Sequence, residues 1–497
     1  MASEKLRQAR DYEARHMPGV PETERPAFHV TGGVGWINDP NGFSCYRGEY
    51  HLFFQYHPYA VQWGPMHWGH VKSRDFITWE RLPVALAPDA ACDRDGCFSG
   101  SALELPDGRH MLMYTGVLRR PGKDGAMEER QTQCLAFGDG VNYEKYGGNP
   151  VITARDLPED GDPANFRDPK IWRGEDGACY SVVGNRTSDG SGAIRLFESG
   201  DCLHWRYAGT IDRSNNECGR MWECPDFFPL DGRQLLLASH QEMEARALEF
   251  RAGYGAICLI GDCDLTSRAF TRERVQSIDC GPDFYAPQTL LTPDGRRVMI
   301  AWMQNWADTD CPPEGARIFG EMTLPRELRV RDGRLIQNPV RELQRYHGNR
   351  VAHEGVRIGG EGSLPGISGR VLDMTVRIRP AGAGYRWFQM NLAKGGEGAV
   401  AVRYRPECGT VRVERGRRGA VDVGEFRVWN RGGEIKLRVV MDRHSVELFV
   451  NDGEQAATFK VGAPPAEDAI TFAADGCALA DVEKYDLDFQ ERNSRDF

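Results

Sequence analysis

One pattern of residues recurs five times along the first two thirds of the chain. Each copy is a turn rich in Gly and Asp, followed by a short β-prone run that ends near a polar or aromatic residue. The copies are RGEYHLFFQYH from Arg47, PDGRHMLMYTG from Pro106, GEDGACYSVVGN from Gly174, LDGRQLLLASH from Leu230 and PDGRRVMIAWM from Pro293. Their starts lie roughly 55–70 residues apart, about the length of a four-stranded propeller blade. The repeat favours a five-bladed β-propeller, although Asp-Gly turns also punctuate other all-β proteins.

The pattern stops after RELQRY at residues 341–346, and short runs of alternating apolar and polar residues follow, such as VLDMTVRIR, TVRVER and IKLRVVMD. Alternating strands with polar outer faces favour an antiparallel sandwich of two packed sheets. The two patterns together predict an all-β chain, in which a five-bladed β-propeller is followed by a C-terminal β-sandwich. The expected domains are an N-terminal extension that is partly helical over Leu6 to Arg15 (1–26), the propeller (27–340), a linker (341–350) and the sandwich (351–497).

The composition excludes several classes of partner. A chain of 497 residues is longer than one hydrophobic core usually fills. Its net charge is -10, and it has no run of basic residues that could follow a phosphate backbone, so nucleic acid is not an expected partner. The initial segment MASEKLRQARDYEARH is charged throughout, and no apolar run is long enough to span a bilayer. We therefore expect a cytoplasmic protein with no membrane partner.

The 14 cysteines are scattered, with no C-x-x-C pair and no Cys/His cluster at zinc spacing. Such spacing is typical of reduced thiols that serve as small buried apolar residues. The sequence therefore predicts neither a disulfide framework nor a structural metal, and it indicates no cofactor.

Cleavage of a glycosidic bond needs two carboxyl groups, one to protonate the departing oxygen and one to attack or to activate water. Three of the 72 acidic residues lie in aromatic segments shaped by Gly or Pro. The first is Asp39 in GWINDPNGF, where Pro40 stiffens the chain and Gly42 permits a tight turn. Asp39 is therefore either a catalytic carboxylate on a rigid loop or the capping residue of an ordinary turn.

The other two acids lie in FRDP and MWECPDFF. Arg167 adjoins Asp168 and would keep it ionised, which suits an acid that binds hydroxyl groups or stabilises positive charge; a surface ion pair is the alternative. Glu223 follows Trp222 in an apolar, aromatic segment, which favours the protonated form that a general acid needs. Asp226 is the competing carboxyl in that segment, and a buried acid satisfied by hydrogen bonds is the alternative for Glu223.

The three acids occupy related positions in the repeat. Asp39 precedes the first repeated strand, Asp168 the third and Glu223 the fourth. Because the innermost strands of all blades line one central channel, acids far apart in the sequence can meet there around one sugar.

Taken together, WINDPNG, FRDP and WECPD resemble, in this order, the three acidic motifs of glycoside hydrolase family 32, the invertase and fructanase family. FFQYHP, WGPMHWGH, LPVALAPD, CFSGSA, QTQCLAF, DFYAPQ and DRHSVELFVNDG also match, so the resemblance covers the chain from about Arg25 to Asp488. A departure is Ile37, which stands where Met or Leu is usual, a swap that conserves volume.

The resemblance implies a retaining β-fructofuranosidase with the fold expected above. It implies that Asp39 is the nucleophile, Asp168 the transition-state stabiliser and Glu223 the acid/base. It also implies that a further set of residues shapes the fructosyl pocket, namely Asn38, Gln55, Trp63, Phe98, Ser99 and Arg167, with Tyr285 and Trp302 as additional wall members.

The expected partner is a small sugar, because the chain looks most similar to bacterial cytoplasmic sucrases and sucrose-6-phosphate hydrolases. A fructan or fructo-oligosaccharide exohydrolase would share every catalytic residue and is the second interpretation. A carbohydrate-binding protein without turnover has no chemical need for the pair Asp39 and Glu223. An arabinan or xylan hydrolase on a propeller is a further alternative, against which the WINDPNG and FYAP tracts argue. The sequence is compatible with a homodimer and leaves the oligomeric state open.

Overall fold

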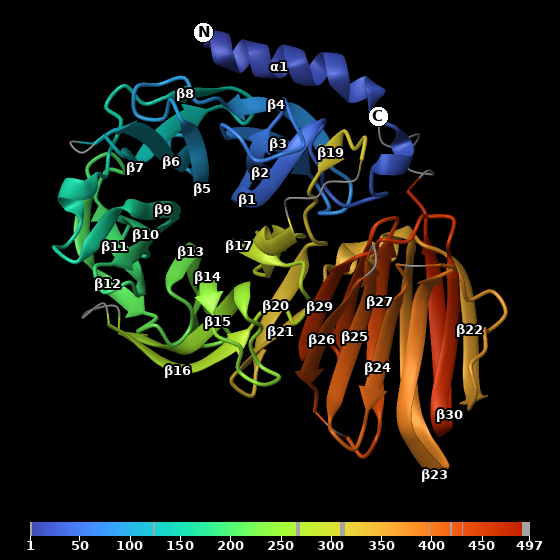
Figure 1. The fold of residues 1–497 in the computed structure, drawn as a ribbon. Coiled ribbons are helices and arrows are strands. Elements are labelled where there is room, and N and C mark those ends of the chain that lie inside the picture. Colours follow the sequence, from blue (N-terminus) through green and yellow to red (C-terminus); the bar gives the residue numbers. More distant parts are fainter. Residues whose placement is uncertain are drawn as a thin grey trace.

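The computed structural model describes residues 2–122, 125–264, 269–308, 314–396, 398–417, 420–429 and 431–489. Five sheets stand in a ring, and a separate body of strands lies beside it (Figure 1). The five-bladed propeller and the C-terminal sandwich expected from the sequence are both confirmed. The first blade contains β1 (Gly35–Tyr46), β2 (Glu49–His57), β3 (His67–Ser73) and β4 (Glu80–Leu86), and the second contains β5 (Gly96–Glu104), β6 (His110–Pro121), β7 (Met127–Gly138) and β8 (Tyr143–Lys145). The third contains β9 (Gly161–Arg173), β10 (Cys179–Thr187), β11 (Gly192–Ser199) and β12 (Arg206–Arg213), and the fourth contains β13 (Met221–Leu230), β14 (Arg233–Met243), β15 (Gly253–Asp264) and β16 (Ala269–Ser277). The fifth contains β17 (Tyr285–Leu291), β18 (Arg297–Trp302), β20 (Arg326–Arg331) and β21 (Arg334–Pro339).

The innermost strand of each blade is the first strand of that blade in the sequence. These strands, β1, β5, β9, β13 and β17, contact one another around the centre of the ring. The five repeated runs form the second strands β2, β6, β10, β14 and β18, whose apolar side chains fill the space between blades. Residues that precede a repeated run therefore fall on the wall of the central channel.

The ring is closed by a short strand, β19 (Ile318–Phe319), which pairs in parallel with the start of β1. Gly35 lies opposite Ile318, and its amide donates a 2.7 Å bond to the carbonyl of Arg317. Gly35 has a φ of +78°, and a Cβ there would lie 2.3 Å from the carbonyl oxygen of His57, so no other residue fits this position without strain. The beginning and the end of the propeller are thus hydrogen-bonded directly beside the segment that carries Asp39.

One expectation about the cysteines is wrong, because Cys179 and Cys202 form a disulfide. Cys179 begins β10, opposite the residue that ends β11, and Cys202 lies in the turn that follows β11. Pairing of these two strands brings the Cα atoms of the two cysteines to 5.8 Å, although 23 residues separate them in the sequence. The disulfide links the start of β10 to the turn after β11, and the spacing of the cysteines in the sequence could not reveal this pairing.

The sandwich is built around two long strands that pass through both layers. β23 pairs with β27 through its first half and with β24 through its second half, and β30 pairs with β23 along most of its length. Apolar side chains of the two layers enclose a single core. The strands are β22 (His347–Ile358), β23 (Leu372–Lys394), β24 (Val400–Arg405), β25 (Thr410–Arg417), β26 (Ala420–Arg427), β27 (Ile435–Asp442), β28 (Ser445–Val450), β29 (Gln455–Lys460) and β30 (Ala469–Leu487).

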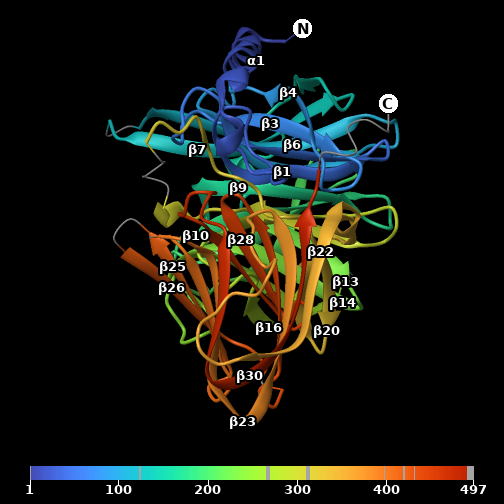
Figure 2. The ribbon, with the colours of Figure 1, turned by 90° about the vertical axis from the view of Figure 1, so that its right-hand side faces the viewer.

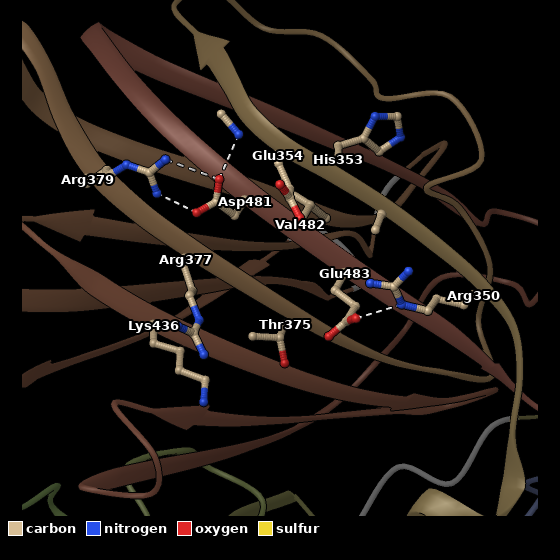
Figure 3. Close-up of a pocket in the computed structure, with 12 residues that line it drawn as sticks. Arg350, His353, Glu354, Thr375, Arg377, Arg379, Lys436, Asp481, Val482 and Glu483 are labelled. Atoms are coloured by element: carbon tan, nitrogen blue, oxygen red, sulfur yellow. Dashed lines mark hydrogen bonds and ion pairs between the residues drawn. The ribbon is translucent and has the colours of Figure 1, made fainter.

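The outer face of the sandwich carries an open hollow of about 620 Å³ over β22, β23, β27 and β30 (Figure 3). Charged side chains line it and pair with one another: Arg379 with Asp481, and Arg350 with Glu483 at 2.8 Å. The charges of this face are therefore largely neutralised within it.

The sandwich lies against the propeller (Figures 1 and 2). A buried polar network joins the two domains. Arg326 on β20 is fully buried and donates to Glu447 on β28 at 2.6 and 3.0 Å and to Asp279 at 2.9 Å. His29, ahead of the first blade, lies between Asp442 and Glu447 at 2.8 and 3.0 Å, and these two carboxylates raise the pKa of its imidazole to about 10, although burial opposes them. Ion pairs in a dry interface are costly to break singly, so the two domains are tightly coupled.

The N-terminal extension forms the helix α1 (Glu4–His16), which includes the helical stretch expected over Leu6 to Arg15. Ser3 caps it by accepting a bond from the amide of Leu6, and Leu6 and Ala9 are buried against the first blade. The short 3-10 helices are η1 (Met17–Gly19), η2 (Glu22–Glu24), η3 (Ala154–Asp156), η4 (Trp306–Asp308) and η5 (Arg341–Tyr346). Within the part of the chain that the structure describes, no helix is long and apolar enough to cross a membrane.

The segment expected as a linker, 341–350, is more ordered than that word suggests. It consists of η5 and the first four residues of β22. Leu343 and Tyr346 of η5 are buried in the core of the first blade, because their apolar side chains face the propeller. The sandwich strands therefore begin at His347.

Candidate active site

All three candidate acids lie on innermost strands: Asp39 on β1, Asp168 on β9 and Glu223 on β13. They meet around Cys224, which follows Glu223. The amide of Cys224 donates a 3.0 Å bond to Oδ2 of Asp168, and its Sγ lies 3.5 Å from Oδ2 of both Asp39 and Asp168. The three motifs, of which the first and the last lie more than 180 residues apart in the sequence, thus converge at one point of the channel.

A β-bulge at the same level of each innermost strand produces this convergence. In every blade the ladder between the first and second strands shifts register at this level, and the first and third blades have a second shift elsewhere. The shifts fall between Ile37 and Pro40, Phe98 and Gly100, Arg167 and Lys170, Glu223 and Asp226, and Tyr285 and Gln288. Because an extra residue bends a strand and re-aims its side chains, the five bulges turn polar groups into the channel.

In the third, fourth and fifth blades the shifted segment ends in a proline, so that the triplets Arg167-Asp168-Pro169, Glu223-Cys224-Pro225 and Tyr285-Ala286-Pro287 are structural equivalents. In the first blade Pro40 comes one register position later, directly after the shift. The middle residues Asp168, Cys224 and Ala286 have φ values of 66°, 46° and 52°. Equivalent residues meet across blades, since Cys224 contacts Asp168, and Glu223 contacts both Arg167 and Tyr285. This internal repeat is the signal that the sequence interpretation missed.

Asp39 is buried and accepts hydrogen bonds from neutral groups. Ser99 Oγ donates to its Oδ2 at 2.7 Å, and Asn38 Nδ2 donates to its Oδ1 at 3.1 Å. Asn38 is itself held by the indole of Trp36 at 2.8 Å. Burial raises the pKa of Asp39, the bond from Ser99 lowers it, and the nearby charge of Glu223 raises it further.

Glu223 has more polar surroundings than its sequence neighbours indicate. Arg167 donates to its Oε1 at 2.8 and 2.9 Å, while Gln241 and Tyr285 donate to its Oε2 at 2.6 and 2.5 Å. The indole of Trp222 points to the opposite face of the strand and donates to the carbonyl of Cys218. The apolar setting expected for Glu223 is therefore absent, and an Arg, a Gln and a Tyr hold its carboxyl group.

Asp226, the competing carboxyl, lies away from this cluster. It is buried, pairs with Lys170 at 3.0 Å and accepts bonds from the amide and hydroxyl of Thr289 at 2.7 and 2.9 Å. These contacts join the third, fourth and fifth blades, so Asp226 is a structural ion-pair partner.

The environment of Asp168 differs from the expectation that Arg167 keeps it ionised. Burial raises the pKa of Asp168 to about 7; Arg167 opposes this shift, and the charges of Glu223 and Asp39 add to it. Arg167 directs its guanidinium to Glu223 on the next blade, because adjacent residues of a strand point to different sides. Burial, together with the charges of the two other carboxyl groups, therefore outweighs the adjacent cation and raises the pKa of Asp168.

This crowding predicts that Asp168→Asn stabilises the fold at alkaline pH. The native pKa of about 7 exceeds the ordinary value of 3.8, so the native state binds more protons between these pH values and loses stability as pH rises through them. The substitution should raise the free energy of unfolding at pH 8 by up to about 4 kcal/mol and change it little at pH 4. Urea unfolding at both pH values measures this, with the exposed turn residue Asp107→Asn as control. An equal change at both pH values would contradict the prediction.

The predicted pocket residues fall into two groups. Asn38, Ser99 and Arg167 directly contact the candidate acids, as described above, and Tyr285 does so through its hydroxyl. Gln55, Trp63, Phe98 and Trp302 do not contact them: Gln55 donates to the carbonyl of Cys97 at 3.0 Å, and Trp63 meets Phe98 edge to face at 6.0 Å. Trp63 is 40% exposed, whereas Trp302 is fully buried and packs against Trp36, which makes Trp302 a support for the wall.

Other contact residues were not predicted. They are Cys224, Gln241 and two partners on the second blade: Gln131, which accepts from Arg167 at 3.3 Å, and Thr115, whose hydroxyl accepts from the amide of Asp168 at 2.9 Å. Gln131 begins the tract QTQCLAF, and Gln241 directly follows the fourth repeated run, so the sequence held a signal near both, but only the fold places them beside the acids. Burial and the neighbouring carboxylates raise the pKa of the Cys224 thiol well above its usual value, so it remains a neutral donor.

Carboxyl groups gathered in the channel of a propeller, two of them in different polar settings, define a glycoside hydrolase. The model of the glycosyl hydrolases family 32 N-terminal domain matches residues 29–339, and that of the family 32 C-terminal domain matches residues 342–487. The chain belongs to glycosyl hydrolase family 32.

Proteins of known activity are similar over nearly the whole chain. A raffinose invertase of Escherichia coli is 36% identical and covers 88% of this chain and 89% of its own length. A sucrose-6-phosphate hydrolase of Zymomonas mobilis is 35% identical, and the match covers 92% of this chain and 91% of that protein. The structure of a family 32 β-fructofuranosidase from Bombyx mori superposes with a TM-score of 0.83 at 33% identity, covering 97% and 98%. A mutant of that enzyme has been solved in complex with sucrose, with a TM-score of 0.84 at 32% identity, covering 98% and 99%.

Proposed function

We propose that this enzyme hydrolyses terminal non-reducing β-D-fructofuranosides with retention, through a covalent fructosyl intermediate on Asp39. The preferred substrate is sucrose or sucrose-6-phosphate. The observation that carries the proposal is the different bonding of two carboxyl groups at one point of the channel. Asp39 accepts bonds only from neutral Asn, Ser and Cys groups, whereas Glu223 is held by three donors that include a cation. Such a pair suits a nucleophile and an acid/base.

In the first step Glu223 protonates the departing oxygen while Asp39 attacks the anomeric carbon of the fructosyl ring. Esterification of Asp39 removes its negative charge. This loss removes the repulsion between the charges of Asp39 and Glu223. Glu223 then takes a proton from water, which attacks the ester. Tyr285 and Gln241 keep Oε2 of Glu223 in place through both steps.

Asp168 would stabilise the positive charge that develops on the fructosyl ring in both transition states. Two amides fix its position: the amide of Asp168 donates to the hydroxyl of Thr115, and the amide of Cys224 donates to the Asp168 carboxylate. Asp168 has a positive φ, in the bulge that brings its carboxylate to Cys224. This placement supports a role in charge stabilisation and hydroxyl binding.

The choice of substrate rests on the relatives, which are named for raffinose, sucrose-6-phosphate and sucrose chemistry. A fructan exohydrolase remains the second candidate function, because a levanase of Bacillus subtilis is 33% identical over 88% of this chain. Initial rates on sucrose, sucrose-6-phosphate, inulin and levan with purified protein decide between them. The cytoplasmic location and a homodimer remain predictions from the sequence.

The roles of the two carboxyls predict how Glu223→Gln behaves. The variant should lose on the order of 10²–10⁴-fold in kcat on sucrose, whose glucose oxygen needs a proton, and much less on a fructoside with an activated leaving group. The carboxyls of Asp39 and Glu223 should lie about 5–5.5 Å apart, and fructose should appear first as the β-anomer, as NMR in the first minutes would detect. An initial α-anomer, or equal losses on both substrates, would contradict the assignment.

Chelators should leave activity unchanged, because carboxylates and hydrogen-bond donors are assigned all of the catalytic work. Among the residues in the described ranges, no group of three His, Cys, Asp or Glu is arranged to hold a metal ion. Sucrose hydrolysis in the presence and absence of EDTA measures this. A loss of activity that a divalent ion restores would overturn the prediction.

A further inference from the structure

A groove of about 520 Å³ lies outside the channel, between α1 and the loop of residues 58–66 that joins β2 to β3. In Figure 1 the helix lies along the outer side of the first blade. The helix makes one wall of the groove, and the loop makes the other. The volume is in the range of pockets that bind small molecules. The loop has two faces, because it also carries Trp63, whose ring meets Phe98 beside Ser99.

The groove has an aromatic wall. Tyr59 is 40% exposed, and its ring meets the ring of Tyr12 edge to face, at 5.0 Å and 70°. Tyr12 is stacked on His16 at 3.9 Å, and His67 approaches Tyr59 at 5.7 Å. The two phenol rings from different elements thus form a corner that is open to solvent. The C–H face of a sugar ring packs well against such an aromatic surface.

Polar groups without a protein partner border this corner. Within the described chain, the Asp11 carboxylate, the Arg15 guanidinium and the hydroxyls of Tyr12 and Tyr59 make no hydrogen bond or ion pair.

The polar side chains that attach α1 to the blade differ from these groups. Lys5 donates to the carbonyl of Pro88 at 2.6 Å, and Arg10 donates to that of Val84 at 2.9 Å. The helix therefore docks through one set of residues and offers a second set, unpaired, to the groove.

We propose that this groove is a second, non-catalytic binding site for a neutral mono- or disaccharide. A ring would stack on Tyr59, while the carboxylate of Asp11 and the guanidinium of Arg15 would bond to pairs of hydroxyls, the mixed aromatic and planar-polar chemistry that sugars require. Asp11 offsets the charge of Arg15, and Lys5, which donates to the carbonyl of Pro88, leaves the groove with one positive charge in excess. A bound sugar would brace the loop that carries Trp63.

Calorimetric titration of sucrose into the Asp39→Asn variant tests the proposal, because the variant does not consume the ligand. Two sucrose sites per chain are expected in Asp39→Asn. The number should fall to one in Asp39→Asn/Tyr59→Ala and should stay at two in Asp39→Asn/Tyr59→Phe, because phenylalanine keeps the aromatic ring. Tyr146→Ala, a half-buried tyrosine on the second blade, is the matched control and should also leave two sites.

Hydrogen exchange of residues 4–16 provides a readout that does not depend on the channel. Sucrose, glucose or fructose should slow exchange in α1 several-fold in Asp39→Asn and should have no effect when Tyr59→Ala is added. The melting temperature of each variant shows whether the helix is still docked. Unchanged exchange with all three sugars, or protection that survives Tyr59→Ala, would overturn the proposal; loss of channel binding alone would bear only on the proposed catalytic function.

Discussion

Replacing Asp39 by asparagine is expected to reduce kcat on every fructoside by on the order of 10⁴-fold or more, because no leaving group compensates for a missing nucleophile. The fold should survive, since the amide oxygen of asparagine can still accept the bond from Ser99, and a buried charge is removed from the repulsive cluster. Steady-state rates on sucrose and on an activated fructoside, with melting temperatures of both proteins, measure the two effects.

The matched control is Cys224→Ser, which alters a side chain that touches the same two carboxylates but forms no covalent bond with the sugar. This change should cost far less activity than Asp39→Asn, because a hydroxyl can replace the thiol as a donor. Substantial turnover by Asp39→Asn, or an equal loss in the two variants, would remove Asp39 from the role of nucleophile.

The second large effect concerns the joint between the domains. Arg326→Met should lower the free energy of unfolding by about 3–5 kcal/mol, because it leaves Asp279 buried without this cation and Glu447 with His29 as its remaining cationic partner. Urea unfolding, followed by tryptophan fluorescence, measures the change. Arg341→Met is the control: its guanidinium bonds Glu327 at 2.6 Å, but the side chain is largely exposed, so little stability should be lost. Equal unfolding midpoints for Arg326→Met and the unmodified protein would show that the network does not hold the domains together.

The architecture was readable from the sequence because each blade repeats the same local chemistry. The repeated runs became the second strands, and the acids that precede them fell on the channel wall. The immediate surroundings of those acids were not readable, because neighbours in a strand point in opposite directions. Trp222 faces away from Glu223, and Arg167 donates its hydrogen bonds to Glu223 on the next blade, so that its charge does not keep the pKa of Asp168 at its ordinary value. Sequence adjacency was thus a poor guide to the electrostatics of the site.

The equivalence of the three proline-closed triplets could be recognised only after the innermost strands were aligned by their register. Each triplet differs in its first two residues, so the shared feature is one proline and a backbone shift. The disulfide was hidden for a similar reason, since strand pairing, and not spacing, brings Cys179 to Cys202.

The closure of the ring also determines when the catalytic site can exist. β1, which carries Asp39, is the first strand to leave the ribosome, but its parallel partner β19 follows roughly 280 residues later, which is about 15–60 s at ordinary rates of synthesis. Until Glu223 and Tyr285 have been made, Asp39 has neither of them nearby, and β1 has an unpaired edge until β19 has been made. The cluster of Asp39, Glu223 and Tyr285 can therefore form only after the fifth blade has begun, and the open edge of β1 is where a chaperone would be most needed before that.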